Sequence, residues 1–197
     1  MINQLRRRLA IYKPRLISVR RPQASVLIAL TNEPDPHVIL TRRSARLSTH
    51  SGEVAFPGGK QDDTDPDLLF TALREAEEEI GLPPDKVEVL AQLGQVVSKH
   101  DIVVTPWVGL IDPDVQLRAN LDELDEIFRV PLSFFLRDTR HHTDKVLFKG
   151  KTRYVPAYHY GGHIIWGLTA FMLVELLNIG LDADIPMKPR PEHEVDC

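Results

Sequence analysis

Four glutamates lie within five residues of the stretch REAEEEIGL (Arg74–Leu82). In a helix, which turns by about 100° per residue, Glu75, Glu78 and Glu79 would share one edge beside a stripe of apolar side chains. The remaining glutamate, Glu77, would face solvent. Carboxylates three and four residues apart repel one another, and partial burial beside a core would increase the cost. A plain solvent-exposed acidic stripe has the same pattern, so the neighbouring residues must decide between the two.

A divalent cation would remove this repulsion. Carboxylate oxygens select hard ions such as Mg²⁺, Mn²⁺ or Ca²⁺, and the stretch carries no histidine or cysteine cluster that would favour zinc. Arg74 lies one turn before Glu78 and is expected to hold a carboxylate in orientation. Upstream, FPGGK (Phe56–Lys60) contains two glycines, whose backbone can approach a metal ion or a phosphate closely. Together these residues predict a metal site on a helix that faces a glycine loop.

The elements that position this site are predicted from periodicity and turn residues. The helix is predicted over 66–80, with Asp65 or Thr64 as its N-cap and Gly81 as its stop. Apolar runs bounded by Gly or Pro clusters predict strands. These runs are SVLIAL (Ser25–Leu30), HVILTRR (His37–Arg43), a short strand near Val54–Phe56, KVEVLAQLG and VVTPWVGLI. Strands mixed with a few helices indicate a layered fold of the α/β or α+β class.

The remaining chain completes a single predicted domain over 1–197. A short amphipathic helix is expected within 1–20, and DEIFRVPLSFFL predicts the end of a strand followed by a short helix. KVLFKGKTRYVPAYHY has the pattern of a hairpin turning at Gly150. IIWGLTAFMLVELLNIG predicts an apolar helix ended by Gly180, with Trp166 and Phe171 in the core. The tail 182–197, with three prolines and mixed charge, is expected to be disordered.

Composition argues against several classes of function. With 43% hydrophobic residues and a net charge of −4, the chain is of ordinary globular composition and lacks the basic excess that would indicate nucleic acid. No apolar run approaches the roughly 18 residues of a membrane span, and no signal peptide is recognisable. The single cysteine is the last residue, Cys197, which suits a reducing cytoplasm. The sequence leaves open whether the chain forms a homodimer.

The glutamate helix and its glycine loop resemble the Nudix hydrolases. The box of that family has a glycine loop, then Arg-Glu, an apolar residue, any residue, Glu-Glu, any residue, Gly and an apolar residue. Arg74–Leu82 matches it at every fixed position. The usual glutamate between the glycine and the arginine is missing, and Asp65 is the nearest substitute, with one extra residue before Arg74. The resemblance implies an α/β/α sandwich with a mixed β-sheet between helices, and a metal-dependent hydrolase of nucleoside diphosphate derivatives.

A second stretch, LTRRSARLSTHSGEVAFPGG (Leu40–Gly59), resembles the signature that precedes the box in the coenzyme A pyrophosphatase branch of this family. That branch shares the altered spacing of the box, although Ser48 stands where it usually has arginine. The resemblance implies hydrolysis of coenzyme A, its thioesters and its disulfides at the pyrophosphate, giving 3′,5′-ADP and 4′-phosphopantetheine or its acyl form. The matching residues are Leu40, Thr41, Arg43, Ser44, Leu47, His50, Gly52, Val54, Phe56, Pro57, Gly58 and Gly59.

The resemblance also implies roles for individual residues. Glu75, Glu78 and Glu79 would hold Mg²⁺ or Mn²⁺ together with the carbonyl of Gly58. Family members often use a later acid as a ligand or general base. Among the acids of LDELDEIF, its position favours Glu123, which is also readable as an ordinary surface acid. The substrate is anionic, and the candidates for contacting it are Arg42, Arg43, Arg46, His50 and Lys60.

Several alternatives stay open at this stage. Each arginine taken alone fits a solvated strand end, and His50 fits a structural role at the Gly52 turn. YHYGGH (Tyr158–His163) fits two elements joined by a glycine turn, as well as an adenine stack or a pantetheine channel. The metal helix would serve equally a Nudix hydrolase of ADP-ribose, a dinucleotide or a nucleoside triphosphate. A metal-dependent nucleotide-binding regulator without turnover is a further alternative, against which the complete acidic triad argues.

Overall fold

The computed structural model describes residues 1–18, 21–46, 52–148 and 151–187. The helices are α1 (Ile2–Ile11), α2 (Leu68–Ile80), the single-turn η1 (Pro84–Lys86), α3 (Leu132–Leu136) and α4 (Gly167–Leu181). The strands are β1 (Gln23–Thr31), β2 (His37–Arg43), β3 (Val54–Ala55), β4 (Gly58–Lys60), β5 (Glu88–Gln92), β6 (Val96–Val97), β7 (Val103–Ile111), β8 (Leu124–Pro131), β9 (His142–Phe148), β10 (Lys151–Tyr160) and β11 (His163–Ile165).

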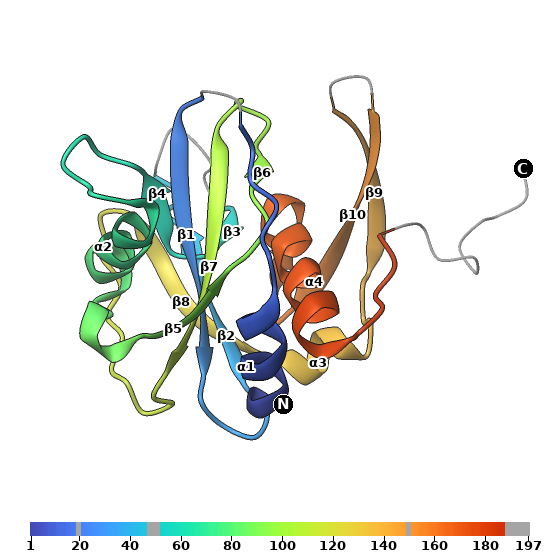
Figure 1. Cartoon of the computed structure of the whole chain (residues 1–197), viewed down its shortest axis with the longest axis horizontal. Helices are drawn as coiled ribbons and strands as arrows, with labels where there is room; N and C mark the ends of the chain where they lie inside the picture. The colour runs from blue at the N-terminus through green and yellow to red at the C-terminus, as the bar shows by residue number, and fades with distance from the viewer. Residues whose placement is uncertain (19–20, 47–51, 149–150, 188–197) are drawn as a thin grey trace, which may run out of the picture.

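A mixed sheet forms the centre of the molecule (Figure 1). Its main order is β3-β2-β1-β7-β5, while β8 pairs with β2, β4 with β1 and β6 with β7. The central strand β1 runs parallel to β7 and antiparallel to β2. A separate three-stranded sheet, β11-β10-β9, lies beside α4. The strands and the β9–β10 hairpin predicted from the sequence are therefore present, although the predicted turn at Gly150 lies outside the described residues.

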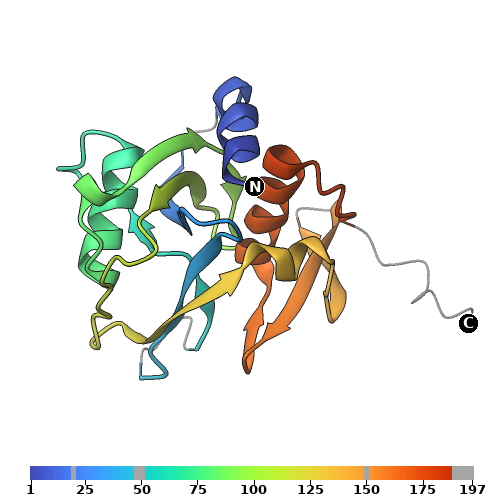
Figure 2. The ribbon, with the colours of Figure 1, turned by 90° about the horizontal axis from the view of Figure 1, so that it is seen from below.

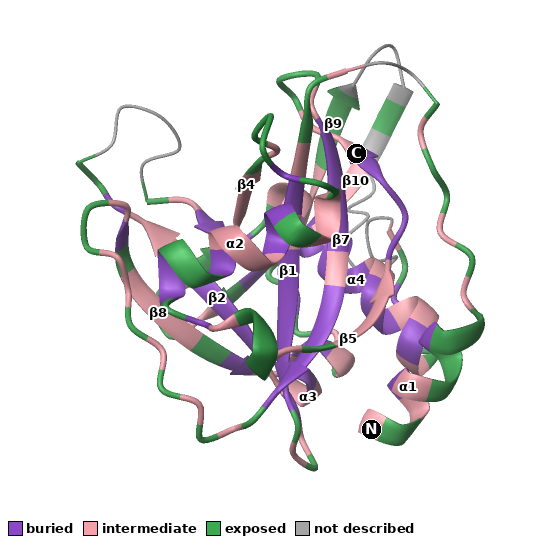
Figure 3. Cartoon of the chain, turned by 60° about the vertical axis from the view of Figure 1, so that its left-hand side comes forward, coloured by how far each residue is buried: buried purple, intermediate pink, exposed green. Residues whose placement is uncertain are grey.

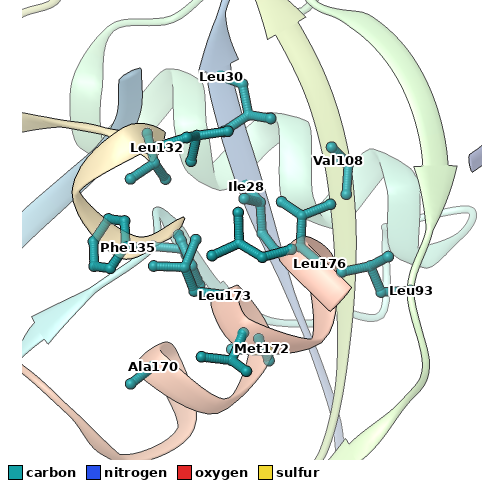
Figure 4. Close-up of a cluster of buried hydrophobic side chains, with 14 of the residues drawn as sticks. Ile28, Leu30, Leu93, Val108, Leu132, Phe135, Ala170, Met172, Leu173 and Leu176 are labelled. Carbon is teal, nitrogen blue, oxygen red and sulfur yellow. The ribbon is translucent and has the colours of Figure 1, made fainter. Parts of the chain in front are cut away.

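Successive side chains of β1 divide the core into two layers, because neighbouring residues of a strand face opposite sides of the sheet. Leu27 and Ala29 are fully buried against the apolar stripe of α2, which includes Ala76. Ile28 and Leu30 are fully buried on the other side, in the layer formed with α1 and α4 (Figure 4). Helices therefore cover both faces of a mixed sheet, which confirms the predicted α/β/α sandwich.

Helix α2 begins and ends with specific caps. Asp67 is the N-cap, and its side chain accepts the N–H of Phe70 at 2.8 Å. The predicted N-caps Asp65 and Thr64 were therefore wrong, as was the start at residue 66. Gly81 ends the helix as predicted, with a φ of 65°. This left-handed conformation favours glycine, which has no Cβ to clash.

Helices lie near both ends of the chain. Helix α1 covers Ile2–Ile11, within the 1–20 segment where a short helix was predicted. Helix α4 continues through the predicted stop Gly180 to Leu181, and the missing Cβ at Gly180 leaves space for Leu5 of α1. The beginning of the tail is packed: Ile185 is buried, and its N–H donates to Asn178 Oδ1 at 2.8 Å. Residues 188–197 of the predicted disordered tail lie outside the described residues. Across the described ranges, no helix has the length and apolarity needed to cross a membrane.

Candidate active site

The three predicted carboxylates of α2 differ in burial, on a helix whose ribbon carries buried, intermediate and exposed residues (Figure 3). Glu79 is only 4% exposed, and its Oε2 accepts the N–H of Gly58 at 3.2 Å. Glu75 is partly buried, with 17% of its side chain exposed, whereas Glu78 is 55% exposed. Glu77 is exposed, as the helical spacing predicts. One acid therefore lies in the interior, one at its border and one at the surface.

Burial and mutual repulsion perturb the inner two acids. Burial raises the pKa of Glu79 to about 8, and the negative charges of Glu75 and Glu123 act in the same direction. The Gly58 N–H and the positive charge of Arg43 oppose this rise only in part. The pKa of Glu75 is also raised, first by burial and then by Glu78 and Glu123, while Arg74 lowers it. A divalent cation bound by these oxygens would offset both causes, so the residues present fit such an ion.

Arg74 connects the loop before the helix to two of these carboxylates. Its Nε and Nη2 donate to the two oxygens of Asp65 at 3.0 and 2.9 Å, a bidentate pair. Its Nη1 lies 3.1 Å from Glu75 Oε1 and 3.1 Å from Glu78 Oε2. The Asp65 side chain has 0% exposure and also accepts Thr71 Oγ1 at 2.9 Å. The Arg74 guanidinium holds the pKa of Asp65 well below its usual range, so the pair stays ionised.

Asp65→Asn should therefore lower activity although Asp65 lies behind the metal ligands. The amide cannot form the charged bidentate pair, so Arg74 loses the anchor from which it reaches Glu75 and Glu78. Removing such a supporting contact typically costs about 10–100-fold in metal affinity or activity. The measurement is the rate at which the enzyme cleaves the pyrophosphate bond of its substrate, over a range of Mg²⁺ concentrations. The exposed Asp63→Asn is the matched control. Equal rates for parent and Asp65→Asn at every Mg²⁺ concentration would show that Arg74 needs no anchor.

The glycine strand β4 lies against both the helix and the central sheet. A Cβ added at Gly58 would collide with the backbone carbonyl of Ser25 and with Val26 in β1. A Cβ added at Gly59 would instead collide with the carboxylate of Glu75. The two glycines thus have separate consequences: Gly58 allows β4 to pair closely with β1, and Gly59 leaves room for an acid of the site.

Alanine at each glycine should separate folding from activity. Gly58→Ala should lower the free energy of unfolding by about 1–3 kcal/mol, because the strand backbone has little room to move. Gly59→Ala should change stability less, because the Glu75 side chain can rotate away, but it should lower kcat by about 10²-fold through that displacement. Thermal melting and steady-state kinetics of the two variants check this. A larger loss of stability in Gly59→Ala and a larger loss of kcat in Gly58→Ala would contradict the roles given to the two glycines.

Glu123 reaches this site from a loop more than forty residues later. Its Oε1 accepts Asn120 Nδ2 at 3.2 Å, and its carbonyl accepts the N–H of Ser44 at 2.8 Å, at the end of β2. Its charge contributes to the raised pKa values of both Glu75 and Glu79. The sequence-predicted loop acid therefore acts electrostatically on the carboxylate cluster.

The five candidates for substrate contact do not form one group. Arg43 acts electrostatically on Glu79, and its buried Nε has no hydrogen-bond partner among the described residues. Arg42 instead faces β8, where its Nη2 lies 3.7 Å from Glu126 Oε2. Arg46 is exposed and donates to the Leu121 carbonyl at 3.1 Å. Two candidates add little: Lys60 is exposed, with its carbonyl accepting Arg74 Nη2 at 3.3 Å, and His50 lies outside the described residues.

A pocket of about 570 Å³ opens beside Arg42. It is lined by Arg42, Gly52, Glu53, Val54, Glu126, Gly161, Gly162, His163, Ile164 and Trp166. Ile164 and Trp166 are 50% and 42% exposed. The prediction that Trp166 lies in the core was therefore wrong. His163 stacks on Phe128 with ring centroids 3.9 Å apart, and its Nε2 lies 3.5 Å from Glu126 Oε1.

Sequence reasoning missed Glu126 and Trp166 as parts of this pocket. It did predict the two elements joined by a glycine turn, and β10 and β11 meet at Gly161 and Gly162, which have φ values of 57° and 85°. The sequence did hold a signal for the exposure of Trp166. Two glycines directly before an apolar segment place the first side chains of that segment near the tip of a hairpin, where they are exposed.

Comparison with known proteins agrees with this geometry. Residues 21–149 match the family described as NUDIX domain. A protein of Photorhabdus laumondii named "Uncharacterized Nudix hydrolase NudL" is 44% identical over 163 residues, which cover 83% of this chain and 87% of the relative. A protein of the same name from Shigella sonnei is 40% identical over 184 residues, covering 92% and 96%.

A solved structure shows the same fold. The MutT/nudix family protein from Enterococcus faecalis aligns with a TM-score of 0.55 at 14% identity, over 86% of this chain and 66% of that chain. Nudix hydrolases act on small molecules and use divalent ions such as Mg²⁺ or Mn²⁺. Because the matched residues 21–149 contain the carboxylate helix, its glycine strand and Glu123, this chain belongs to the Nudix hydrolase family and is a pyrophosphohydrolase of nucleoside diphosphate derivatives.

Proposed function

We propose that the chain hydrolyses the pyrophosphate bond of coenzyme A and its derivatives, in the cytoplasm. The observation that supports this most directly is the pair Arg42 and Arg43 at the end of β2. Arg43 acts on the carboxylate cluster through Glu79, and the adjacent Arg42 lines the 570 Å³ pocket. A substrate with a diphosphate at one end of a nucleotide would span these two positions.

The chemistry of the pocket suits such a nucleotide. Trp166 and Ile164 offer exposed apolar surface on which an adenine ring can pack, and Arg42 offers a planar cation for a phosphate. The buried Nε of Arg43, which lacks a partner among the described residues, is a second donor for phosphate oxygen. The stretch Leu40–Gly59, which resembles the coenzyme A branch, supplies both arginines and part of the pocket wall.

The reaction adds one water across the phosphorus–oxygen–phosphorus linkage, and the products are 3′,5′-ADP and 4′-phosphopantetheine. Bound Mg²⁺ or Mn²⁺ would neutralise charge on the diphosphate and acidify a water. Glu75, Glu78 and Glu79 are the residues that would hold these ions. Arg74 keeps two of those carboxylates in place, and Glu123 is the proposed acceptor of the proton from the attacking water.

Product analysis tests this proposal. The purified chain is incubated with coenzyme A and Mg²⁺ or Mn²⁺ in ¹⁸O-labelled water, and the products are identified by mass. We expect phosphopantetheine and 3′,5′-ADP, with one labelled oxygen in the product whose phosphorus was attacked. ADP-ribose, a dinucleotide and a nucleoside triphosphate are run in parallel at the same concentration. If one of these is hydrolysed while coenzyme A stays intact, that compound is the substrate and the proposal of coenzyme A is wrong.

A further inference from the structure

A cluster of three histidines lies on the small sheet, outside the site described above. His142 is the first residue of β9, His141 directly precedes it, and His159 lies near the end of β10. All three are exposed, and their candidate ligand nitrogens lie within 4.8 Å of one another. The β9–β10 hairpin and helix α2 occupy opposite ends of the molecule (Figures 1 and 2). The cluster is therefore separate from the carboxylates.

Strand pairing creates the cluster from residues that are distant in sequence. Ala157 pairs with His142 across the antiparallel ladder, and the His141 N–H donates to the Ala157 carbonyl at 2.7 Å. His159, two residues further along β10, then stacks on His141 with centroids 4.0 Å apart and planes 6° apart. The backbone hydrogen bonds thus fix the three Cα positions, while the exposed rings can rotate.

Each ring nitrogen of His142 faces a different partner. Its Nε2 lies 3.4 Å from Asp144 Oδ1, which favours a hydrogen on Nε2. Its Nδ1 then keeps a lone pair, and this Nδ1 lies 2.9 Å from His141 Nδ1. A carboxylate that holds one imidazole nitrogen while the other faces a second imidazole is the usual surrounding of a metal-binding histidine. A separation of 2.9 Å is that of an N–H···N hydrogen bond, and an ion bound at this position would replace its proton.

We propose that His141, His142 and His159 form a binding site for a transition-metal ion of the Zn²⁺ class. Zinc–nitrogen bonds of about 2.0–2.1 Å in a tetrahedron place two ligand nitrogens about 3.3 Å apart. The observed separations, from 2.9 Å to at most 4.8 Å, bracket that value. Rotation of one of the two stacked rings directs its lone pair at the ion, and water fills the fourth position.

This site and the carboxylate site should select different metals. Imidazole is a ligand for Zn²⁺, Cu²⁺ and Ni²⁺, whereas carboxylates alone suit Mg²⁺ and Mn²⁺. An ion held by His141 and His159 would link the connection after α3 to β10, and so would stabilise the small sheet. The proposal does not depend on which substrate the hydrolase uses.

Zinc binding to the full chain tests the proposal, measured by calorimetry in a large excess of Mg²⁺ that occupies the carboxylates. We expect one equivalent of Zn²⁺ to bind and to raise the melting temperature. His142→Gln and His159→Gln should each remove this binding, and Asp144→Asn should weaken it by about tenfold. The matched control is His100→Gln, an exposed histidine on another loop, and it should bind zinc as the parent does.

Co²⁺ absorption and circular dichroism distinguish loss of the histidine ligands from loss of folding. Co²⁺ replacing Zn²⁺ should give the visible absorption of a tetrahedral nitrogen site in the parent and in Glu78→Gln, but not in His159→Gln. Far-ultraviolet circular dichroism checks that each variant is folded, and His141→Gln substitutes for any histidine variant that is not. Zinc binding that persists in the folded histidine variants, or that disappears in Glu78→Gln, would overturn the proposal.

Discussion

Glu78→Gln should lower kcat by about 10³-fold and leave the melting temperature almost unchanged. The Glu78 side chain is 55% exposed, so glutamine at this position loses little packing. It does lose a charged oxygen ligand for the ion that offsets the charge of the transition state. A metal ion supplies several kcal/mol of such stabilisation, and the loss of about 4 kcal/mol corresponds to about three powers of ten in rate.

Glu77→Gln is the matched control, because Glu77 is an exposed glutamate on the same helix that points away from the cluster. It should retain the activity of the parent. Rates are measured at saturating substrate over a range of Mg²⁺ and Mn²⁺ concentrations, together with thermal melting curves. Comparable losses in both variants would mean that overall negative charge matters rather than ligation. Full activity in Glu78→Gln would remove that carboxylate from the metal site.

The carboxylate helix was predictable because its signals are local. Helical spacing alone puts Glu75, Glu78 and Glu79 beside an apolar stripe, and Gly81 is a recognisable helix stop. The N-cap was predicted at the wrong residue because an aspartate can either cap the helix or form an ion pair with an arginine. Asp65 is as good a capping residue as Asp67, but its carboxylate is bound by Arg74, nine residues later. That competition is decided by the tertiary structure and is not visible in local sequence.

The pocket shows a second limit of sequence reasoning. A tryptophan before a long apolar helix resembles a core residue, and only the meeting of β11 with β3 and of Arg42 with Glu126 makes Trp166 part of a pocket wall. The separation of Arg42 from Arg43 was predictable, because neighbouring residues of a strand face opposite sides of the sheet. The partner of each was not: Arg42 lies by the pocket acid Glu126, and Arg43 acts on Glu79. Contacts between distant strands create these pairings.

The buried acid makes the metal-free enzyme less stable at alkaline pH. The pKa of Glu79 is about 8 in the folded chain, against an ordinary value of 4.5 that an unfolded chain would show. Between these values the folded state binds more protons than the unfolded state, so the free energy of unfolding falls as pH rises through that window. Glu75, whose pKa is also raised, acts in the same direction. The loss through Glu79 is complete above about pH 8.

Glu79→Gln should therefore stabilise the metal-free protein while it removes activity. Glutamine keeps an oxygen for the Gly58 N–H and carries no charge, so the penalty for an ionised buried acid disappears. At about pH 9 we expect the variant to exceed the parent by on the order of 5 kcal/mol, and near about pH 5 we expect little difference. Urea unfolding in EDTA at the two pH values measures this.

Addition of Mg²⁺ should then reverse the order of stability. The ion stabilises the parent, in which all three carboxylates are present, more than a variant that lacks the innermost one. A stability difference between Glu79→Gln and parent that is independent of pH would show that packing, rather than ionisation, sets the cost at this position. If instead the difference grows with pH and is reversed by Mg²⁺, the repulsion among the crowded acids of the metal-free site is the energy that an ion gains by binding there.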